Sequence, residues 1–302
     1  MTDSTKQLHQ LFHDEWEYRL QADPLFATWT GDHRYNDRLP RSREEDFADF
    51  ASNLAAFRCR LDGIDRITLP PAEQLNYDIW QRLIDNELCE LELGGYRLPL
   101  SKMWGFHIAF ADCYLTMPFD TAEDYEKYIA RLNAFPGYVQ DQIELMRSAL
   151  EHNFIPPRVT LEGVDKAMRV QLVSDPVDSV LYKPFLSFPA TLDEAQRARL
   201  SQAGQAAILG AVMPGFQAGL TFLLEEYLPM ARETIAASEL PPGSEFYTHR
   251  IRFYTSLELS PQEVHQTGLN EVARIRAEME EVKNEVGFKG AFRQFIEFLR
   301  HD

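Results

Sequence analysis

The feature that most limits how this chain can fold is a long stretch without a charged side chain. No Asp, Glu, Lys or Arg occurs from Leu200 to Leu224, a run of 25 residues. A helix of this length is long enough to cross a bilayer. The run also contains glutamines and the pair Pro214-Gly215, and it holds more alanine and glycine than leucine. We therefore expect a buried central helix in a helical protein, with a membrane span as the alternative.

Apolar residues recur at helical spacing along almost the whole sequence, and the period-2 alternation of strands is scarce. Ser260, Pro261 and Glu263 form the clearest helix start, as N-cap, first helical residue and third residue of a capping box. Ser42 and Glu45 predict a second capping box. We therefore predict an all-α, multi-helix array. The expected helices lie at about residues 4–22, 25–30, 42–60, 71–94, 121–135, 137–152, 161–173, 192–235 with a kink at Pro214, 244–256 and 261–286.

The segment at about 96–120 departs from this pattern. It contains prolines and glycines and is rich in aromatic residues. Long irregular segments of this kind are often functional, or they pack across a helical scaffold. We take Trp104, His107 and Tyr114 as candidates for the lining of a substrate groove. Ordinary core packing is the alternative for His107.

Composition excludes several classes of protein. The chain carries 30 Lys and Arg against 47 Asp and Glu, and its formal charge of −17 repels phosphate backbones and anionic lipid. Nucleic acid and membrane are therefore not expected partners. Cys59, Cys89 and Cys113 are an odd number without a Cys-x-x-Cys pair, so neither a disulfide framework nor a thiolate metal site is expected. The first residues lack the apolar segment of a signal peptide, which favours the cytoplasm.

No catalytic motif is found in the sequence. The pair His9 and His13 has the spacing of two metal ligands on a helix, but no third ligand can be assigned, and we interpret it as a solvated helix face. Neither a Gly-x-Ser-x-Gly elbow nor a P-loop occurs. We interpret Gly204, Gly210 and Gly215 as positions that allow close helix packing. We expect no catalytic residue, metal ligand or cofactor in this chain.

The apolar spacing in the last segment, Ala291–Asp302, predicts a helix, and no helix-stop signal follows it. Phe292, Phe295 and Leu299 require a surface to pack against. Either this helix docks onto its own chain, or it contacts further protein. In the second case the partner is the remainder of a larger domain, or a second copy of the chain.

Six short segments are more informative together than any single motif. They are Trp29–Leu39, Met117–Tyr125, Tyr128–Leu132, Leu228–Arg232, Leu259–Leu269 and Glu271–Ile275. In this order and spacing they resemble successive signatures of a bacterial domain-of-unknown-function family, number 885. The resemblance extends along nearly the whole chain.

The resemblance implies a fold and a function. Members of that family are largely helical and are regarded as zinc metallopeptidases, similar to helical oligopeptidases with a deep channel. They are considerably longer than this chain, and their metal motif, a His-Glu pair followed by two adjacent histidines, lies in the C-terminal half. The resemblance thus implies that residues 1–302 are a single helical region, the incomplete N-terminal part of a larger domain, truncated before the metal motif.

The leading hypothesis is therefore that this chain builds one wall of a peptide-binding channel. Zinc is expected in the missing C-terminal half, where it would activate water with a glutamate as base, so this chain would be inactive alone. The alternative is a non-catalytic helical binding module, which recruits a partner or self-associates through Phe292, Phe295 and Leu299.

Overall fold

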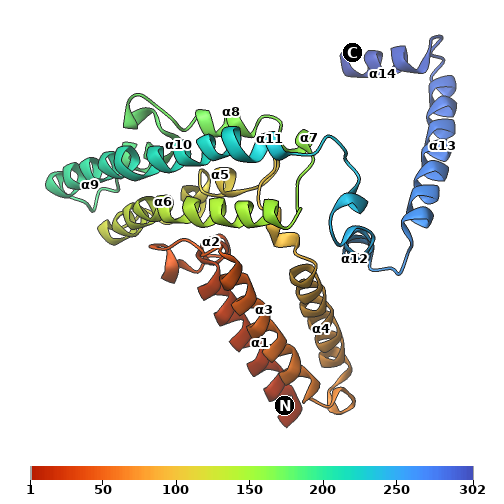
Figure 1. The fold of residues 1–302 in the computed structure, drawn as a ribbon, viewed down its shortest axis with the longest axis horizontal. Coiled ribbons are helices and arrows are strands. Elements are labelled where there is room, and N and C mark those ends of the chain that lie inside the picture. Colours follow the sequence, from red (N-terminus) through yellow and green to blue (C-terminus); the bar gives the residue numbers. More distant parts are fainter. Residues whose placement is uncertain (1, 302) are drawn as a thin grey trace. The chain divides into compact units, whose positions relative to one another are not determined.

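The computed structural model describes residues 2–301 and confirms an all-α protein (Figure 1). No β-strand occurs among these residues, and one isolated bridge pairs Pro157 with Arg232. The chain divides into two compact units, residues 1–243 and residues 244–302. Each unit is described separately.

The first unit contains the helices α1 to α11, several of them very short. Their bounds are α1 Asp3–Ala22, α2 Pro24–Trp29, α3 Glu44–Asp62, α4 Pro71–Glu92, α5 Phe106–Ala109, α6 Ala122–Glu151, α7 Arg158–Leu161, α8 Val164–Arg169, α9 Glu194–Ala207, α10 Met213–Phe222 and α11 Leu228–Met230. Short 3-10 turns connect them: η1 His33–Tyr35, η2 Arg66–Thr68, η3 Gly95–Arg97, η4 Cys113–Thr116, η5 Pro176–Asp178, η6 Val180–Leu186 and η9 Ala237–Glu239. Two π-helical turns, η7 Ile208–Val212 and η8 Leu223–Tyr227, join α9, α10 and α11 into one helix.

That continuous helix, Glu194–Met230, carries the uncharged run and packs against α6 (Figure 1). By length and composition it could cross a membrane, but 56% of its most apolar window is buried inside the protein. Ile208, Val212 and Phe216 are fully buried in the core. The expectation of a buried central helix is confirmed. The π turn η7 ends two residues before Pro214, whose ring nitrogen carries no N–H to donate to the preceding turn.

Local capping signals set several of the helix starts. Thr121 and Asp124 form a capping box at α6, with the Thr121 N–H donating to Asp124 Oδ2 at 2.9 Å. The predicted box at Ser42 and Glu45 is wrong by one residue. Asp46 instead accepts from the backbone N–H of Arg43 at 2.9 Å, and α3 begins at Glu44. At residues 135–137, where a kink or a restart of the helix is expected, no restart occurs, since α6 continues through Pro136.

The aromatic segment at 96–120 packs across the scaffold. It is irregular apart from the short turns η3, α5 and η4. Phe106 and Phe110 are buried in the core, and the Phe110 ring stacks on Phe135 of α6 at a centroid distance of 3.7 Å. The segment therefore supplies aromatic side chains to the hydrophobic core, although most of it is not helical.

Two glycines of the central helix permit close packing, as predicted. A Cβ atom added at Gly204 would lie 2.6 Å from the Phe185 ring, and one added at Gly215 would lie 2.7 Å from the Phe135 ring. The prediction is wrong for Gly210, where an added Cβ would meet nothing within 4 Å. Gly219 of the same helix also faces an aromatic ring, since an added Cβ would lie 3.1 Å from Phe106.

The second unit contains the helices α12 Gly243–Thr255, α13 Pro261–Glu285 and α14 Phe292–His301. The predicted capping box of Ser260 and Glu263 is confirmed, with the Ser260 N–H donating to Glu263 Oε2 at 2.8 Å. The same contacts lower the pKa of Glu263. In α14, Phe295 is buried and its ring lies 5.3 Å from that of Phe288. The last helix thus docks partly onto its own unit.

The glycine contacts give a first test of this packing. We expect Gly215→Ala to lower the free energy of unfolding by about 1–3 kcal/mol, because the new methyl group overlaps the Phe135 ring. Gly210→Ala is the matched control on the same helix, and should be neutral or stabilising by up to ~1 kcal/mol. Urea denaturation followed by circular dichroism measures both. Equal effects of the two substitutions would contradict the packing described here.

Candidate functional site

A groove with a volume of about 1030 Å³ opens in the first unit, and we call it the polar groove. It is bounded by the end of α1, the start of α2, the loop of residues 37–42, α3, one position of α4 and two positions of α6. Its lining consists of Tyr18, Arg19, Gln21, Ala22, Asp23, Pro24, Phe26, Asp37, Arg38, Leu39, Pro40, Arg41, Ser42, Asp46, Phe47, Asp49, Phe50, Asn53, Glu87, Ala134 and Tyr138.

The end of the groove at α1 and α2 follows from a local sequence signal. Asp23 ends α1 and caps α2, since its Oδ1 accepts the N–H groups of Leu25 and Phe26, both at 3.0 Å. Pro24 is the first residue of α2, where its missing N–H costs nothing. The chain therefore turns sharply at Asp23-Pro24, as the sequence predicts.

A buried arginine of α6 holds the loop that forms another wall. Arg131 has no exposed surface. Its guanidinium donates to the carbonyl oxygens of Tyr35 and Arg38, both at 2.9 Å, and to the hydroxyl of Thr28 at 2.9 Å. A fourth acceptor, the carbonyl of Pro24, lies at 3.3 Å. Burial lowers the pKa of Arg131. These bonds fix α2 and the following loop on the surface of α6.

Two ion pairs order charged residues along the groove. Arg19 makes a bidentate contact with Glu87, at 3.0 and 2.7 Å, and also bonds Glu15 at 2.8 Å. Burial acts to lower the pKa of Arg19, but the hydrogen bonds and charges of these carboxylates raise it. Arg41 contacts the buried Asp141 through Nε at 2.7 Å. Such paired groups are set in position before any ligand arrives.

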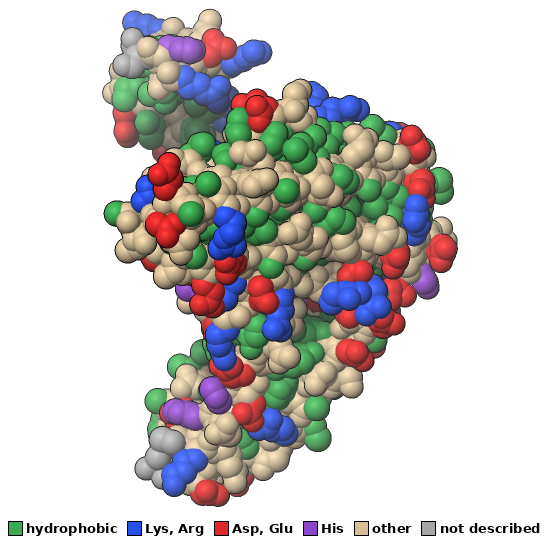
Figure 2. Space-filling view, turned by 90° about the vertical axis from the view of Figure 1, so that its left-hand side faces the viewer, with side chains coloured by type: hydrophobic (Ala, Val, Ile, Leu, Met, Phe, Trp, Pro, Cys, Tyr) green, Lys and Arg blue, Asp and Glu red, His purple; other side chains and the backbone are tan. Residues whose placement is uncertain are grey.

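The lining is suited to binding. It combines cationic and anionic side chains with five aromatic rings, and it contains neither histidine nor cysteine. On the face drawn in Figure 2, acidic and basic side chains are likewise interspersed, without a large patch of one sign. Charged groups of both signs beside aromatic surface can hold a ligand that is itself both charged and apolar.

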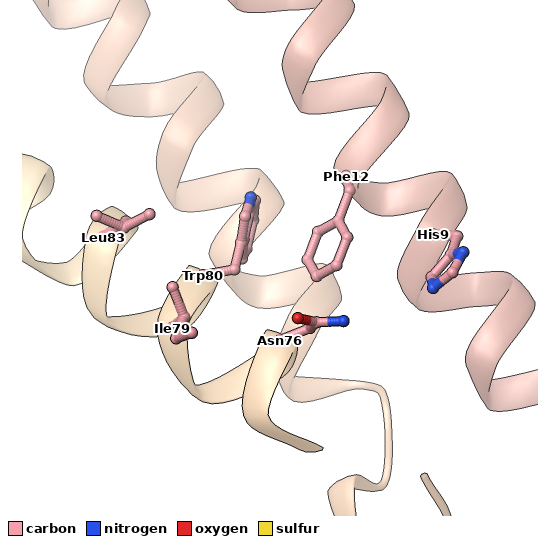
Figure 3. Close-up of a pocket in the computed structure, with 6 residues that line it drawn as sticks. All are labelled: His9, Phe12, Asn76, Ile79, Trp80 and Leu83. Atoms are coloured by element: carbon pink, nitrogen blue, oxygen red, sulfur yellow. The ribbon is translucent and has the colours of Figure 1, made fainter. Parts of the chain in front are cut away.

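A second hollow, of about 490 Å³, lies between α1 and α4 (Figure 3). Its lining residues are His9, Phe12, Asn76, Ile79, Trp80 and Leu83. His9 Nε2 lies 2.9 Å from Glu73 Oε1, while His13 is exposed. Within residues 2–301 no group of three or more His, Cys, Asp or Glu side chains could hold a metal ion. This hollow is therefore mainly apolar, with the hydrogen-bonded pair of His9 and Glu73 beside it.

The predicted groove residues lie in different surroundings, and none of them lines the polar groove. Trp104 is 61% exposed. His107 is buried, and both of its ring nitrogens lack a hydrogen-bond partner in the described structure. Tyr114 is partly buried against the core, with Lys183 Nζ 5.9 Å from its ring centroid. Neither of the two hollows described above is lined by any of these three side chains.

The buried cysteine, Cys113, is not a candidate nucleophile. All three cysteines carry thiols: Cys59 is exposed, Cys89 half-buried and Cys113 buried. Burial raises the pKa of the Cys113 thiol to about 12, so this thiol stays protonated at neutral pH.

The polar groove was missed at the level of sequence because its walls come from distant segments. One signal was nevertheless present. The segments Trp29–Leu39 and Tyr128–Leu132, both part of the family resemblance, meet in the structure through Arg131 and the loop carbonyls. Arg131 itself is the part of this signal that is visible in the sequence, as a charged residue on the otherwise apolar face of a predicted helix.

Comparisons with known proteins agree with an all-α fold. The family described as bacterial protein of unknown function (DUF885) matches residues 24–302. No curated protein matches significantly. A solved structure described as a "putative lipoprotein" from Colwellia psychrerythraea superimposes with a TM-score of 0.90 at 22% identity, covering 100% of this chain and 55% of that one. Another, a "putative lipoprotein of unknown function" from Shewanella oneidensis, gives a TM-score of 0.57 at 15% identity, covering 95% and 48%. This chain therefore spans about half the length of the solved structures that it matches.

The hydrogen bonds of Arg131 predict a large cost for its removal. We expect Arg131→Met to lower the free energy of unfolding by about 3 kcal/mol or more, because several buried acceptors lose their donor. Arg199→Met, which breaks the exposed pair with Glu126, is the matched control and should cost less than about 1 kcal/mol. Urea denaturation measures both variants. Similar losses in the two would show that Arg131 does not hold the loop.

Burial of His107 predicts a pH-dependent stability. Burial lowers its pKa from 6.5 to about 4, so the unfolded chain binds this proton more readily than the folded chain. The free energy of unfolding should therefore fall as pH drops from 6.5 towards 4, by a contribution of at most about 3 kcal/mol.

The variant His107→Leu removes this titrating group and should flatten that part of the profile, relative to wild type. His13→Leu, at an exposed position of α1, serves as the control and should retain the wild-type slope. Thermal unfolding at a series of pH values provides the measurement. An unchanged slope in His107→Leu would assign the acid sensitivity to other groups.

Proposed function

The chain belongs to the family of bacterial proteins of unknown function (DUF885), and on that premise we propose that it is the substrate-binding part of a longer peptidase-like protein. The observation that carries this proposal is the polar groove. Its ligand would be an extended peptide, held in one wall of a channel.

The lining of the groove supports a peptide ligand. A peptide offers backbone hydrogen-bonding groups, charges of either sign and apolar side chains. Arg38, Arg41 and Asp49 are exposed at the groove, while Phe47 and Phe50 add aromatic surface. Because Arg41 is anchored to Asp141, part of this surface is rigid before binding, which reduces the entropy lost by the protein.

Zinc chemistry does not fit residues 2–301, which offer no group of three ligating side chains. The solved Colwellia psychrerythraea chain extends well beyond the part that this chain covers. We accordingly assign any zinc-dependent hydrolysis to polypeptide outside this sequence, and expect this chain to be inactive alone. Trp104, His107 and Tyr114 remain proposed contacts to a peptide on other parts of such a channel.

A second candidate function is a non-catalytic interaction module. It is favoured by the exposed apolar side chains of the second unit, among them Leu299, which is 60% exposed. Of the residues predicted for self-association, Phe295 is buried and Phe292 lies under the Arg276 guanidinium, 3.6 Å from its ring centroid. Leu299 is therefore the best placed of the three to contact another molecule.

The site of action is a separate part of the proposal. The sequence favours the cytoplasm, whereas both matched structures are described as putative lipoproteins. We infer a location at the cell envelope as the working proposal. Fractionation of the source cells, followed by immunoblotting for this chain, tests it directly.

Peptide binding without hydrolysis is the expected behaviour of the purified chain. Fluorescein-labelled decapeptides containing both arginine and aromatic residues should bind, as measured by fluorescence anisotropy. Arg38→Glu combined with Asp49→Lys should weaken binding by about tenfold or more, because the charges at the groove are inverted. Arg169→Glu combined with Asp165→Lys, a pair outside the groove, is the charge-matched control. Equal binding by all variants would exclude the polar groove as the site.

The same preparation tests the assignment of hydrolysis. Elemental analysis should find no stoichiometric zinc, and fluorogenic peptides should remain uncleaved. One equivalent of bound zinc together with cleavage that a chelator abolishes would overturn the assignment.

A further inference from the structure

Helix α13 exposes a regular apolar stripe. Val272, Ile275, Met279, Val282 and Val286 follow one another at alternating steps of three and four residues. All five are between 39% and 69% exposed. This spacing is typical of a helix that packs lengthwise against another helix.

The stripe forms one side of an apolar groove, and α14 forms the other. This α13–α14 groove has a volume of about 470 Å³ and lies entirely within the second unit. On the α14 side its lining includes Phe298 and Leu299, which are 45% and 60% exposed. Helix-binding grooves present this kind of surface to the apolar face of an amphipathic helix.

One flank of the stripe is already occupied within the chain. The Arg276 guanidinium stacks on the Phe292 ring, and Lys283 Nζ donates to the carbonyl of Gly290 at 3.2 Å. These contacts direct the basic side chains of α13 towards α14 and the turn before it.

The opposite flank is acidic and open. Glu271, Glu278, Glu281 and Glu285 lie along it, with Arg274 as the single cation. Arg274 bonds Glu271 and Glu278, both at 2.6 Å, which leaves an excess of negative charge beside the stripe. A docking helix would meet this charge along its own edge.

This charge pattern disfavours a second copy as the occupant. In an antiparallel pair the acidic flanks of the two copies would face each other, and like charges repel. In a parallel pair each acidic flank would meet the basic flank of the other copy, which α14 and its turn already occupy. A helix with basic residues beside its apolar stripe fits better.

We propose that the α13–α14 groove binds an amphipathic helix with lysine or arginine beside its apolar stripe, supplied by polypeptide outside these residues. The inference rests on the proposed function and names the contact between this chain and the rest of the longer protein. The matched Colwellia psychrerythraea chain is long enough to supply such a helix, because 55% of it accounts for the whole of this chain.

Two labelled synthetic peptides test the groove on the full chain. Both carry leucine at the a and d positions of three heptads; one has lysine and the other glutamate at the e and g positions. In fluorescence anisotropy the lysine peptide should bind wild type about tenfold or more tightly than the glutamate peptide.

Met279→Asp should abolish this binding. Leu269→Asp, exposed on the same helix but outside the groove, should leave it unchanged. Glu278→Lys with Glu285→Lys should reverse the peptide preference.

Each other outcome overturns the proposal in a defined way. Equal binding of the two peptides, or no binding, removes the basic helix as the occupant. A dimer in sedimentation velocity that Met279→Asp dissociates identifies a second copy instead. Cosedimentation with phosphatidylglycerol vesicles that Met279→Asp prevents identifies a lipid surface. Decapeptide binding at the polar groove should be the same in wild type and Met279→Asp, so failure here is distinguishable from failure of the proposed function.

Discussion

The architecture of the first unit depends on how one buried cation is satisfied. Arg131 lies fully buried on α6 and forms no ion pair with a carboxylate among the described residues; carbonyl oxygens and a hydroxyl accept its hydrogen bonds. A buried charge is costly unless its donors are all engaged. The loop after α2 must therefore place its carbonyls around the guanidinium, and this requirement fixes the path of the chain. The backbone of Tyr35 and Arg38 is held by α6, a helix about a hundred residues further along the sequence.

The polar groove is a consequence of that arrangement. Since the carbonyl groups of the loop turn towards Arg131, its side chains are free to face the groove. Arg38 illustrates both roles, because its carbonyl accepts from Arg131 while its side chain lines the groove. The ion pair of Arg41 with Asp141 ties the same loop to α6 a second time. A binding surface supported in this way is preorganised by the core instead of being assembled by the ligand.

The features predictable from the sequence are those with local causes. The capping boxes at Thr121 and Ser260 and the sharp turn at Asp23 each depend on residues within a few positions, and the structure contains them all. The uncharged run from Leu200 to Leu224 predicted a buried helix, because a helix without charges needs an apolar environment. The start of α3 was misplaced since Ser42 and Arg43 compete for the same capping position, and the contact of Asp46 with Arg43 decides between them. By contrast, the surroundings of Arg131 and His107 are set by distant segments, and no spacing rule brings those together.

The two units use apolar residues in opposite ways, and this contrast connects the fold to the proposed function. In the first unit the central helix buries Ile208, Val212 and Phe216, and the groove surface is polar. In the second unit the apolar stripe of α13 is exposed over its length. The acidic side chains beside this apolar surface keep the isolated chain soluble. Because the surface itself is apolar, no hydrogen bond of the protein is lost when a helix covers it. The two proposed binding surfaces, one for a peptide and one for further polypeptide, therefore lie in different units, so that a substitution in one surface need not disturb the other.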